Sequence, residues 1–145
     1  MKKMSLLCAA TLVFCTAANA AGVKDKKRWK EAISQVDPVR VEAEKACGIS
    51  LGFSFDKESF GSDLAKLDDV GMGGYCGDAF TAMADLCGDD DYREAMTTVK
   101  SLTCAYDESL EKPNVSLADG ALGFTFNWDT ANHEQTVEDF LEDNL

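Results

Sequence analysis

The chain has little basic charge, a single histidine and no phosphate-binding loop, and each shortage counts against a class of function. Of its 145 residues, 26 are acidic and 14 are basic, which gives a net charge of −12. This balance argues against nucleic acid and anionic membrane surfaces as partners, because both repel an acidic protein. The motif G-x-x-x-x-G-K-[ST] is missing, and His133 falls at a predicted helix start. We therefore expect no cofactor and no catalysis, with an enzyme whose site the sequence does not reveal as the alternative.

The sequence also lacks any apolar run near the roughly 20 residues that span a bilayer, so we expect no membrane-spanning segment. A shorter run, Leu6 to Ala18, follows lysines at positions 2 and 3 and ends in the A-x-A pattern Ala18-Asn19-Ala20. These features are typical of a secretory signal peptide over residues 1–20. We expect its removal to leave a periplasmic or secreted bacterial protein that begins at Ala21. Loss of the two lysines changes the net charge from −12 to −14.

Removal of the signal peptide would leave four cysteines, an even number. The gaps between the remaining cysteines, 29, 11 and 17 residues, do not match the short ligand spacing of zinc sites. A chain bound for an oxidising compartment forms disulfides. Two disulfides are therefore expected, from Cys47, Cys76, Cys87 and Cys104. Cys8 and Cys15 raise the alternative of a lipoprotein, although each follows a bulky residue where lipidation favours a small one.

The stretch from Gly74 to Gly88 is predicted to be a helix around which the chain is organised. Its apolar stripe consists of Cys76, Phe80, Met83 and Cys87, at offsets of 0, 4, 7 and 11. Eleven residues of helix separate the two cysteines by roughly 16 Å, far beyond the roughly 7 Å Cα limit of a disulfide. The two cysteines of this helix therefore pair elsewhere, with elements before and after it.

Two pairings remain open. We favour Cys47 with Cys76 and Cys87 with Cys104, because a short return after Cys87 would bring the strand of Cys104 back beside the end of the central helix. The other pairing joins Cys47 to Cys87 and Cys76 to Cys104.

Before the central helix, apolar spacing predicts helices over 29–36 and 38–47, with Asp37 as the N-cap and Pro38 as the first residue of the second helix. Strict alternation predicts a strand over 49–55, and residues 56–74 are predicted to be a long connection.

After the central helix, Asp91 and Glu94 have the spacing of a capping box for a short helix that ends near residue 98. Alternation then predicts a strand over 101–106. Asn132 and Gln135 have the same capping-box spacing before a last helix, which buries Val137, Phe140 and Leu141.

The segment Val115 to Trp128 predicts a β-hairpin. Asp119-Gly120 lies between two alternating runs and suits a two-residue type I′ turn, which requires positive φ at both positions. If Ala118 lies opposite Ala121, the apolar residues of both strands fall on one side of the sheet. Together the elements predict one α+β domain over residues 21–145, with a four-stranded, largely antiparallel sheet, helices on one face and two disulfides.

Two acidic features have alternative explanations. Asp89, Asp90 and Asp91 are weak calcium candidates, as are Asp68 and Asp69, because carboxylate oxygens suit a hard cation. Neither run follows the EF-hand loop pattern, so we favour a solvated acidic loop, with helix capping for the aspartates at 89–91, over calcium binding.

The N-terminal segment 24–30 holds five of the basic residues, whereas the last helix ends in acidic ones. Both arrangements oppose the helix dipole. The two termini either pair with each other, or the basic segment is a frayed tail.

The outward face of the predicted sheet carries no charge. Its residues are Ser50, Gly52, Ser54, Ser101, Thr103, Ala105, Ser116, Ala118, Gly123, Thr125 and Asn127. Glycine, alanine and serine are poor choices for a strand face that is merely solvated. This face is therefore a candidate docking surface for a partner. A stacked second copy, the N-terminal helix folded over the face and an ordinary wet sheet surface are the alternatives.

These observations favour a small exported binding or accessory domain of a bacterial envelope. We expect it to recognise a protein or a glycan through its surface, and that partner to be basic if charge guides the encounter. A carrier of cations or small ligands that uses acidic loops is the alternative.

Overall fold

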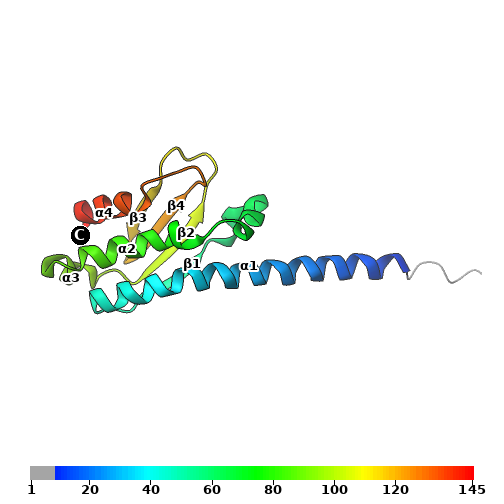
Figure 1. Cartoon of the computed structure of the whole chain (residues 1–145), viewed down its shortest axis with the longest axis horizontal. Coiled ribbons are helices and arrows are strands. Elements are labelled where there is room, and N and C mark those ends of the chain that lie inside the picture. The colour runs from blue at the N-terminus through cyan, green and yellow to red at the C-terminus, as the bar shows by residue number, and fades with distance from the viewer. Residues whose placement is uncertain (1–8) are drawn as a thin grey trace, which may run out of the picture.

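Figure 1 shows the computed structural model, which describes the backbone of residues 9–145 and the side chains from residue 22 onward. The predicted signal peptide lies partly outside the described residues and stays a prediction. The elements are α1 (Ala9–Cys47), β1 (Gly52–Phe55), η1 (Lys57–Asp68), η2 (Met72–Gly74), α2 (Cys76–Leu86), α3 (Asp90–Met96), β2 (Ser101–Tyr106), β3 (Asn114–Ala118), β4 (Ala121–Phe126) and α4 (His133–Asn144), where η marks a 3₁₀ helix. The predicted α+β class is confirmed.

A single long helix, α1, replaces the two helices predicted around Asp37 and Pro38. A proline inside a helix leaves the carbonyl group four residues earlier without its donor. Here that residue is Ser34, and Ser34 and Pro38 are both exposed, so water can satisfy the carbonyl. The apolar stripe of α1 continues through the proline on the opposite side. Packing of this stripe against the core therefore keeps α1 continuous through Pro38, the residue that we expected to begin a second helix.

The sheet has the strand order β1-β2-β4-β3 and its pairing is mixed. Strands β3 and β4 pair in the expected antiparallel way, whereas β1 with β2 and β2 with β4 are parallel. Parallel neighbours need a long crossover connection, usually a helix. The segment from η1 through α3, which contains α2, makes that connection between β1 and β2. Strand β1 is also shorter than predicted, because residues 49–51 lie outside it.

The β3–β4 hairpin is confirmed in detail. Asp119 and Gly120 have φ values of 53° and 82°, and Ala118 lies opposite Ala121. Val115 faces Phe124 in the same register. The sequence was sufficient here because the turn chemistry and the alternation agree.

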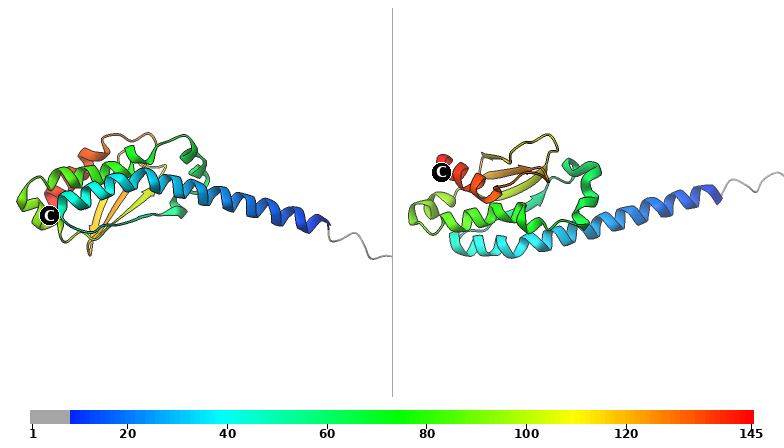
Figure 2. Two further views of the ribbon diagram at one scale, coloured as in Figure 1. Left: turned by 60° about the horizontal axis from the view of Figure 1, so that its bottom comes forward. Right: turned by 45° about the horizontal axis from the view of Figure 1, so that its top comes forward.

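Helices α1, α2 and α4 lie on one face of the sheet (Figures 1 and 2). The predicted stripe of α2 is fully buried in this layer, and so are Leu102 and Cys104 of β2. At one end of the layer, Phe60 of η1 packs in an aromatic cluster with Trp29, Phe55, Tyr106, Phe126 and Trp128. The segment 56–74 is thus an ordered pair of 3₁₀ helices that closes the core.

Neither predicted capping box forms. Helix α3 begins two residues earlier than expected, and the Asp89 side chain caps it by accepting a hydrogen bond from the Asp91 backbone N–H. Asn132 precedes α4 with a left-handed backbone and makes no capping bond, while Gln135 donates to Asp139. Helix α4 buries Val137 and Leu141 as predicted, although Phe140 is only half-buried.

Candidate functional site

The face of the sheet turned away from the helices is a grid of small, uncharged residues. The strand register sets them in three rows: Gly52, Ser101, Ala121 and Ala118; Ser54, Thr103, Gly123 and Ser116; Ala105, Thr125 and Asn114. All of them are exposed or half-exposed. Among the described residues no helix lies over this face (Figure 2). We call these eleven residues the open face.

Short contacts link neighbouring strands on the open face. The hydroxyl groups of Ser54 and Thr103 lie 3.2 Å apart across the β1–β2 pair. A Cβ on Gly123 would lie 2.6 Å from the Ser116 hydroxyl, so glycine leaves room for that side chain.

The structure places the predicted docking residues on the open face with two exceptions. Ser50 precedes β1 and belongs to the turn after α1. Asn127 follows β4, and its side chain holds the neighbouring loop: the amide group donates to the carbonyl oxygens of Glu108 and Leu110, and the amide oxygen accepts from the Asp129 N–H. Alternation alone put these two residues on the face because it did not show where the strands end.

An acidic groove lies at one end of the open face, where the parallel strands β1 and β2 end. Its volume is about 440 Å³. Its lining residues are Asp56, Ser59, Phe60, Gly61, Ser62, Asp63, Ala105, Tyr106, Asp107, Glu108 and Thr125. Open sheets with parallel strands commonly bind ligands at the carboxyl ends of those strands. Ala105 and Thr125 belong to both surfaces, which makes the groove continuous with the open face.

Sequence reasoning missed the residues of the groove. Asp56 and Asp107 directly follow predicted strands, and that position was the one available signal. In a largely antiparallel sheet this position would not bring the two aspartates together, because antiparallel neighbours end at opposite edges.

The disulfides join Cys47 to Cys87 and Cys76 to Cys104, so the favoured pairing is wrong and the other one is present. Strand β2 runs back along α2, and Cys104 is its fourth residue. Each strand residue advances roughly 3.3 Å, so by Cys104 the strand has run back about 10 Å from its start. The bond to Cys76 holds Cys104 beside the first residue of α2, while Cys87, just past the last residue of α2, is bonded to Cys47 at the end of α1.

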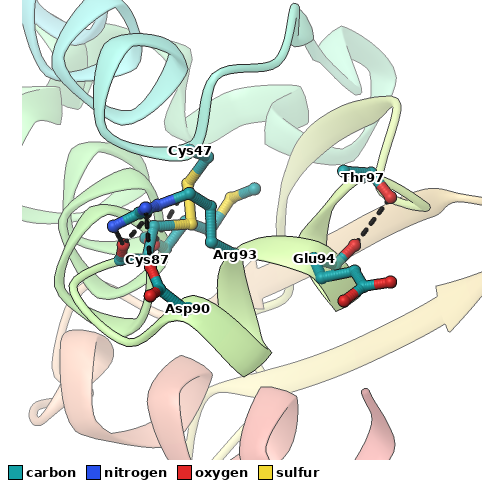
Figure 3. The surroundings of a disulfide bond; sticks show 7 residues. Cys47, Cys87, Asp90, Arg93, Glu94 and Thr97 are labelled. Carbon is teal, nitrogen blue, oxygen red and sulfur yellow. Dashed lines mark hydrogen bonds and ion pairs between the residues drawn. A yellow bond between two sulfur atoms is a disulfide. The ribbon is translucent and has the colours of Figure 1, made fainter.

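The contacts around Cys87 stabilise the end of α2. Figure 3 shows the Arg93 side chain folded back over the end of α2, where its Nε and Nη2 donate to the Cys87 carbonyl oxygen at 3.0 and 2.8 Å. Arg93 also pairs with Asp90 at 2.8 Å. Both disulfides are buried, and burial away from solvent makes them inert to thiol exchange.

Three of the five weak calcium candidates have side-chain partners within the fold. Asp89 caps α3 and Asp90 pairs with Arg93. Asp68 pairs with Arg28. The described residues include no group of three or more His, Cys, Asp or Glu side chains arranged to hold a metal ion.

The basic segment 24–30 is helical and pairs with η1. Arg28 contacts Asp68 of η1 and Asp25 of its own helix, and Lys24 lies 3.9 Å from Asp68. Neither suggestion from the sequence describes this arrangement, since the segment is neither a frayed tail nor the partner of the C-terminal acidic residues. The Arg28 guanidinium holds the pKa of Asp68 below its usual value.

His133 is buried and fastens the start of α4 to the start of α2. Its Nδ1 lies 3.0 Å from the Gly74 carbonyl oxygen and 3.4 Å from an Asp78 carboxylate oxygen. Its Nε2 lies 3.2 Å from the Thr130 hydroxyl. A carbonyl oxygen can only accept, so Nδ1 carries a proton and donates. Both ring nitrogens are thus occupied in holding α4 in place.

One serine has the spacing of a nucleophile elbow, which the expectation of no catalysis did not take into account. Gly48, Ser50 and Gly52 fit the pattern G-x-S-x-G. In that motif the serine sits on a turn from strand to helix. Here Ser50 lies on a turn from helix α1 to strand β1, and the histidine of the chain is bound to Gly74 and Thr130. The pattern therefore lacks both the strand-to-helix turn and a histidine available to activate the serine.

The fold and these surfaces define a class of protein: a small α+β domain held by two disulfides, with an open sheet face and an acidic groove at its end. In the described part of the chain, no helix is both long and apolar enough to cross a bilayer. Comparison with known proteins adds no relative, since no family model, curated protein or solved structure matches this chain.

Proposed function

We propose that this chain is an exported bacterial binding domain that recognises a partner protein through its open face. The observation that carries the proposal is the grid of eleven uncharged residues in a chain with 40 charged ones. A strand face that only meets water normally carries charged or long polar side chains. Small side chains over three rows instead leave a surface without long projecting groups, which another protein surface can approach closely.

Export is supported by the sequence and agrees with the disulfides. The features of residues 1–20 are those of a signal peptide. Both disulfides are buried within the core, and disulfides persist in oxidising compartments such as the periplasm. These observations favour the periplasm or the exterior as the site of binding.

Charge selects the kind of partner. Asp56, Asp63, Asp107 and Glu108 lie around one end of the open face, and the chain as a whole is strongly acidic. A second copy would bring like charges together and be repelled, whereas a protein with a neutral flat surface and a basic margin would be attracted. We therefore assign the face to a basic protein partner.

A second candidate function is that of a carrier for a small cationic ligand. The acidic groove favours it, because four carboxylates line the groove and no lysine or arginine does.

The proposal is tested by capture from an envelope extract with the oxidised chain as bait. The double variant Thr103→Arg and Thr125→Arg places two long cations on the open face. Because both positions face away from the core, we expect the free energy of unfolding to change by less than about 0.5 kcal/mol. The parent should retain one specific protein that the double variant loses.

A matched variant with Ser34→Arg and Ala131→Arg adds the same charge at exposed positions away from the face, and it should capture the same protein as the parent. Normal capture by the face variant would show that the open face is not the docking surface. Treatment of the extract with protease separates the ligand classes. Capture that survives protease would identify a glycan instead of a protein.

A further inference from the structure

Strand β3 is an edge strand whose outer side pairs with no other strand among the described residues. It lies last in the strand order β1-β2-β4-β3, with β4 on its inner side. Exposed edges are usually protected by a charged side chain, a proline, a bulge or a very short strand. The five residues Asn114–Ala118 contain no charge and no proline, and they pair with β4 without a bulge. The other edge strand, β1, is shorter, and Arg40 donates to the Leu51 carbonyl oxygen beside it.

The strand register shows which backbone groups of β3 point outward. The Phe126 carbonyl oxygen accepts from the Asp107 N–H, so the even-numbered residues of β4 bond toward β2. The odd-numbered residues of β4 therefore bond to the even-numbered residues of β3. The N–H and C=O groups of Val115 and Leu117 point away from the sheet, and no other described segment bonds to them. These four backbone groups are the ones that an added strand would use.

Val115 and Leu117 also leave apolar surface at this edge. Their side chains point to the helix side of the sheet, because they alternate with Ser116 of the open face. Both pack against the core but are only half-buried, and α4 contacts β3 (Figure 1). Side chains of an added strand that lay beside Val115 and Leu117 would therefore cover apolar surface that is now partly in water.

Acidic residues flank this edge at both ends. Asp119 directly follows the strand, and a hollow of about 490 Å³ adjoins its start, where residues 111–113 meet α4. The charged residues that line the hollow are Glu111, Asp129, Asp139 and Lys112. None of these four acids belongs to an ion pair among the described residues. A segment with basic ends would be attracted, whereas an antiparallel second copy would place its acidic turn against the acidic hollow and be repelled.

We propose that β3 binds an extended segment of a basic partner protein, which adds a fifth strand to the sheet by bonding to the backbone of Val115 and Leu117. Strand addition takes affinity from backbone hydrogen bonds and specificity from alternate side chains. An antiparallel segment with a basic residue at each end would place one beside Asp119 and the other beside the hollow. This inference rests on the proposed function for the source of the segment, because the added strand would extend the open face. The edge itself can be tested without the partner.

The test is an NMR titration of the oxidised chain with the peptide Ac-Lys-Thr-Val-Thr-Val-Thr-Lys-NH2. Its valines and lysines lie on one face of a strand, with the valines opposite Val115 and Leu117 in the antiparallel register. The peptide should shift the backbone amides of residues 114–118 in a saturable way. Methylation of both valine nitrogens removes the bonds to the edge and should weaken binding at least ten-fold, whereas methylation of two threonine nitrogens should not. Replacement of both lysines by glutamate should weaken binding at least three-fold.

A pair of variants tests the same edge from the side of the chain. Val115→Pro removes an outward N–H that the fold does not use, and proline is tolerated at edge positions of this kind. We expect this variant to keep the hairpin and to bind the lysine peptide at least ten-fold more weakly. Val115→Thr keeps the branched shape and the N–H, so it should bind the peptide as the parent does. If Val115→Pro failed to fold, the two methylated peptides would still decide the question on the parent chain.

Three results would overturn the inference. The absence of saturable shifts at residues 114–118, or equal binding of the valine-methylated peptide, would show that the backbone of β3 is not a binding edge. Equal binding of the glutamate peptide would show that charge does not select the partner. Dimerisation of the chain alone, abolished by Val115→Pro, would assign the edge to a second copy. Loss of peptide binding would leave the Thr103 and Thr125 capture experiment intact, so the two proposals fail separately.

Discussion

Arg28 of α1 and Asp68 at the end of η1 form a two-pronged ion pair, in which Nε and Nη2 each lie 2.7 Å from a different carboxylate oxygen. Arg28 also contacts Asp25 at 3.0 Å, which fixes the guanidinium plane. Paired bonds of this type add directional specificity to the attraction. This contact anchors the far end of the 3₁₀ segment whose Phe60 closes the core.

Asp68→Asn should loosen η1 without unfolding the domain. The amide keeps one acceptor oxygen but loses the charge, so amide hydrogen exchange over residues 57–68 should become faster while exchange in α2 stays slow. Asp69→Asn, at an exposed neighbouring carboxylate, should have no such effect. Equal exchange in both variants would show that the ion pair does not hold η1.

The same pair predicts a pH dependence. The pKa of Asp68 is lowered in the folded state, mainly by its hydrogen bonds to Arg28. Its contribution to stability is therefore complete above the ordinary aspartate pKa of about 3.9 and is lost as the pH falls through the lowered folded value. Exchange rates of η1 in the parent and in Asp68→Asn should thus differ at neutral pH and converge below pH 4. A difference that persisted at low pH would contradict the assignment.

Gly120→Ala should destabilise the hairpin by roughly 2 kcal/mol. Its φ of 82° is unfavourable for any side chain, and a Cβ would lie 2.6 Å from the Thr98 carbonyl oxygen. That oxygen is backbone and cannot rotate away. Urea denaturation measures the effect, and Gly71→Ala is the control, because Gly71 has a φ of −77° and open space around it. Similar stability of the two variants would show that the turn tolerates a side chain.

Each disulfide should stabilise the fold by about 4 kcal/mol in the chain-entropy model, because the pairs are separated by 40 and 28 residues. The alanine pairs Cys47→Ala with Cys87→Ala, and Cys76→Ala with Cys104→Ala, should each lower the melting temperature and leave one intact bond. Non-reducing peptide mapping checks the connectivity directly. A peptide that linked Cys47 to Cys76 would contradict the structure.

Glu134→Gln should stabilise the domain at neutral pH by a few tenths of a kcal/mol. Burial, followed by the carboxylates of Asp85, Asp78 and Glu138, raises the pKa of Glu134 in the folded state. A carboxyl group with a raised pKa opposes folding when ionised, and this cost disappears as the pH falls below the folded value. The gain should therefore be present at pH 7 and vanish near pH 4. Glu142→Gln, at an exposed site near the chain end, is the control in the same urea titrations.

Local structure in this protein could be predicted where the hydrophobic pattern and the residues suited to a turn indicated the same element. The hairpin was predicted down to its register because Asp119-Gly120 suits the positive φ values of the turn and the alternation on both sides points the same residues inward. The buried stripe of α2 follows in the same way from offsets of 3 and 4 residues. Both are decided by neighbours in the chain, so no knowledge of distant segments was needed.

The helix boundaries were less predictable because more than one polar residue could serve as a cap. Asp89, and not Asp91, caps α3. Pro38 lies inside α1 because its exposed side of the helix tolerates the missing hydrogen bond while the opposite side stays packed. Tertiary packing settled what local preference left ambiguous.

What the sequence by itself determined is the buried stripe of α2, which strands form the hairpin and which cysteines form bonds. Only the tertiary structure decided the direction of β1 and β2 relative to α2, and with it the pairing of Cys76 with Cys104 and the gathering of Asp56 and Asp107 at one edge of the sheet. The physical reason is that alternation and helical spacing report which side of an element meets the core, and they are unchanged when the whole element is reversed. The direction of a strand depends on the crossover that leads to it, which is a property of the assembled fold.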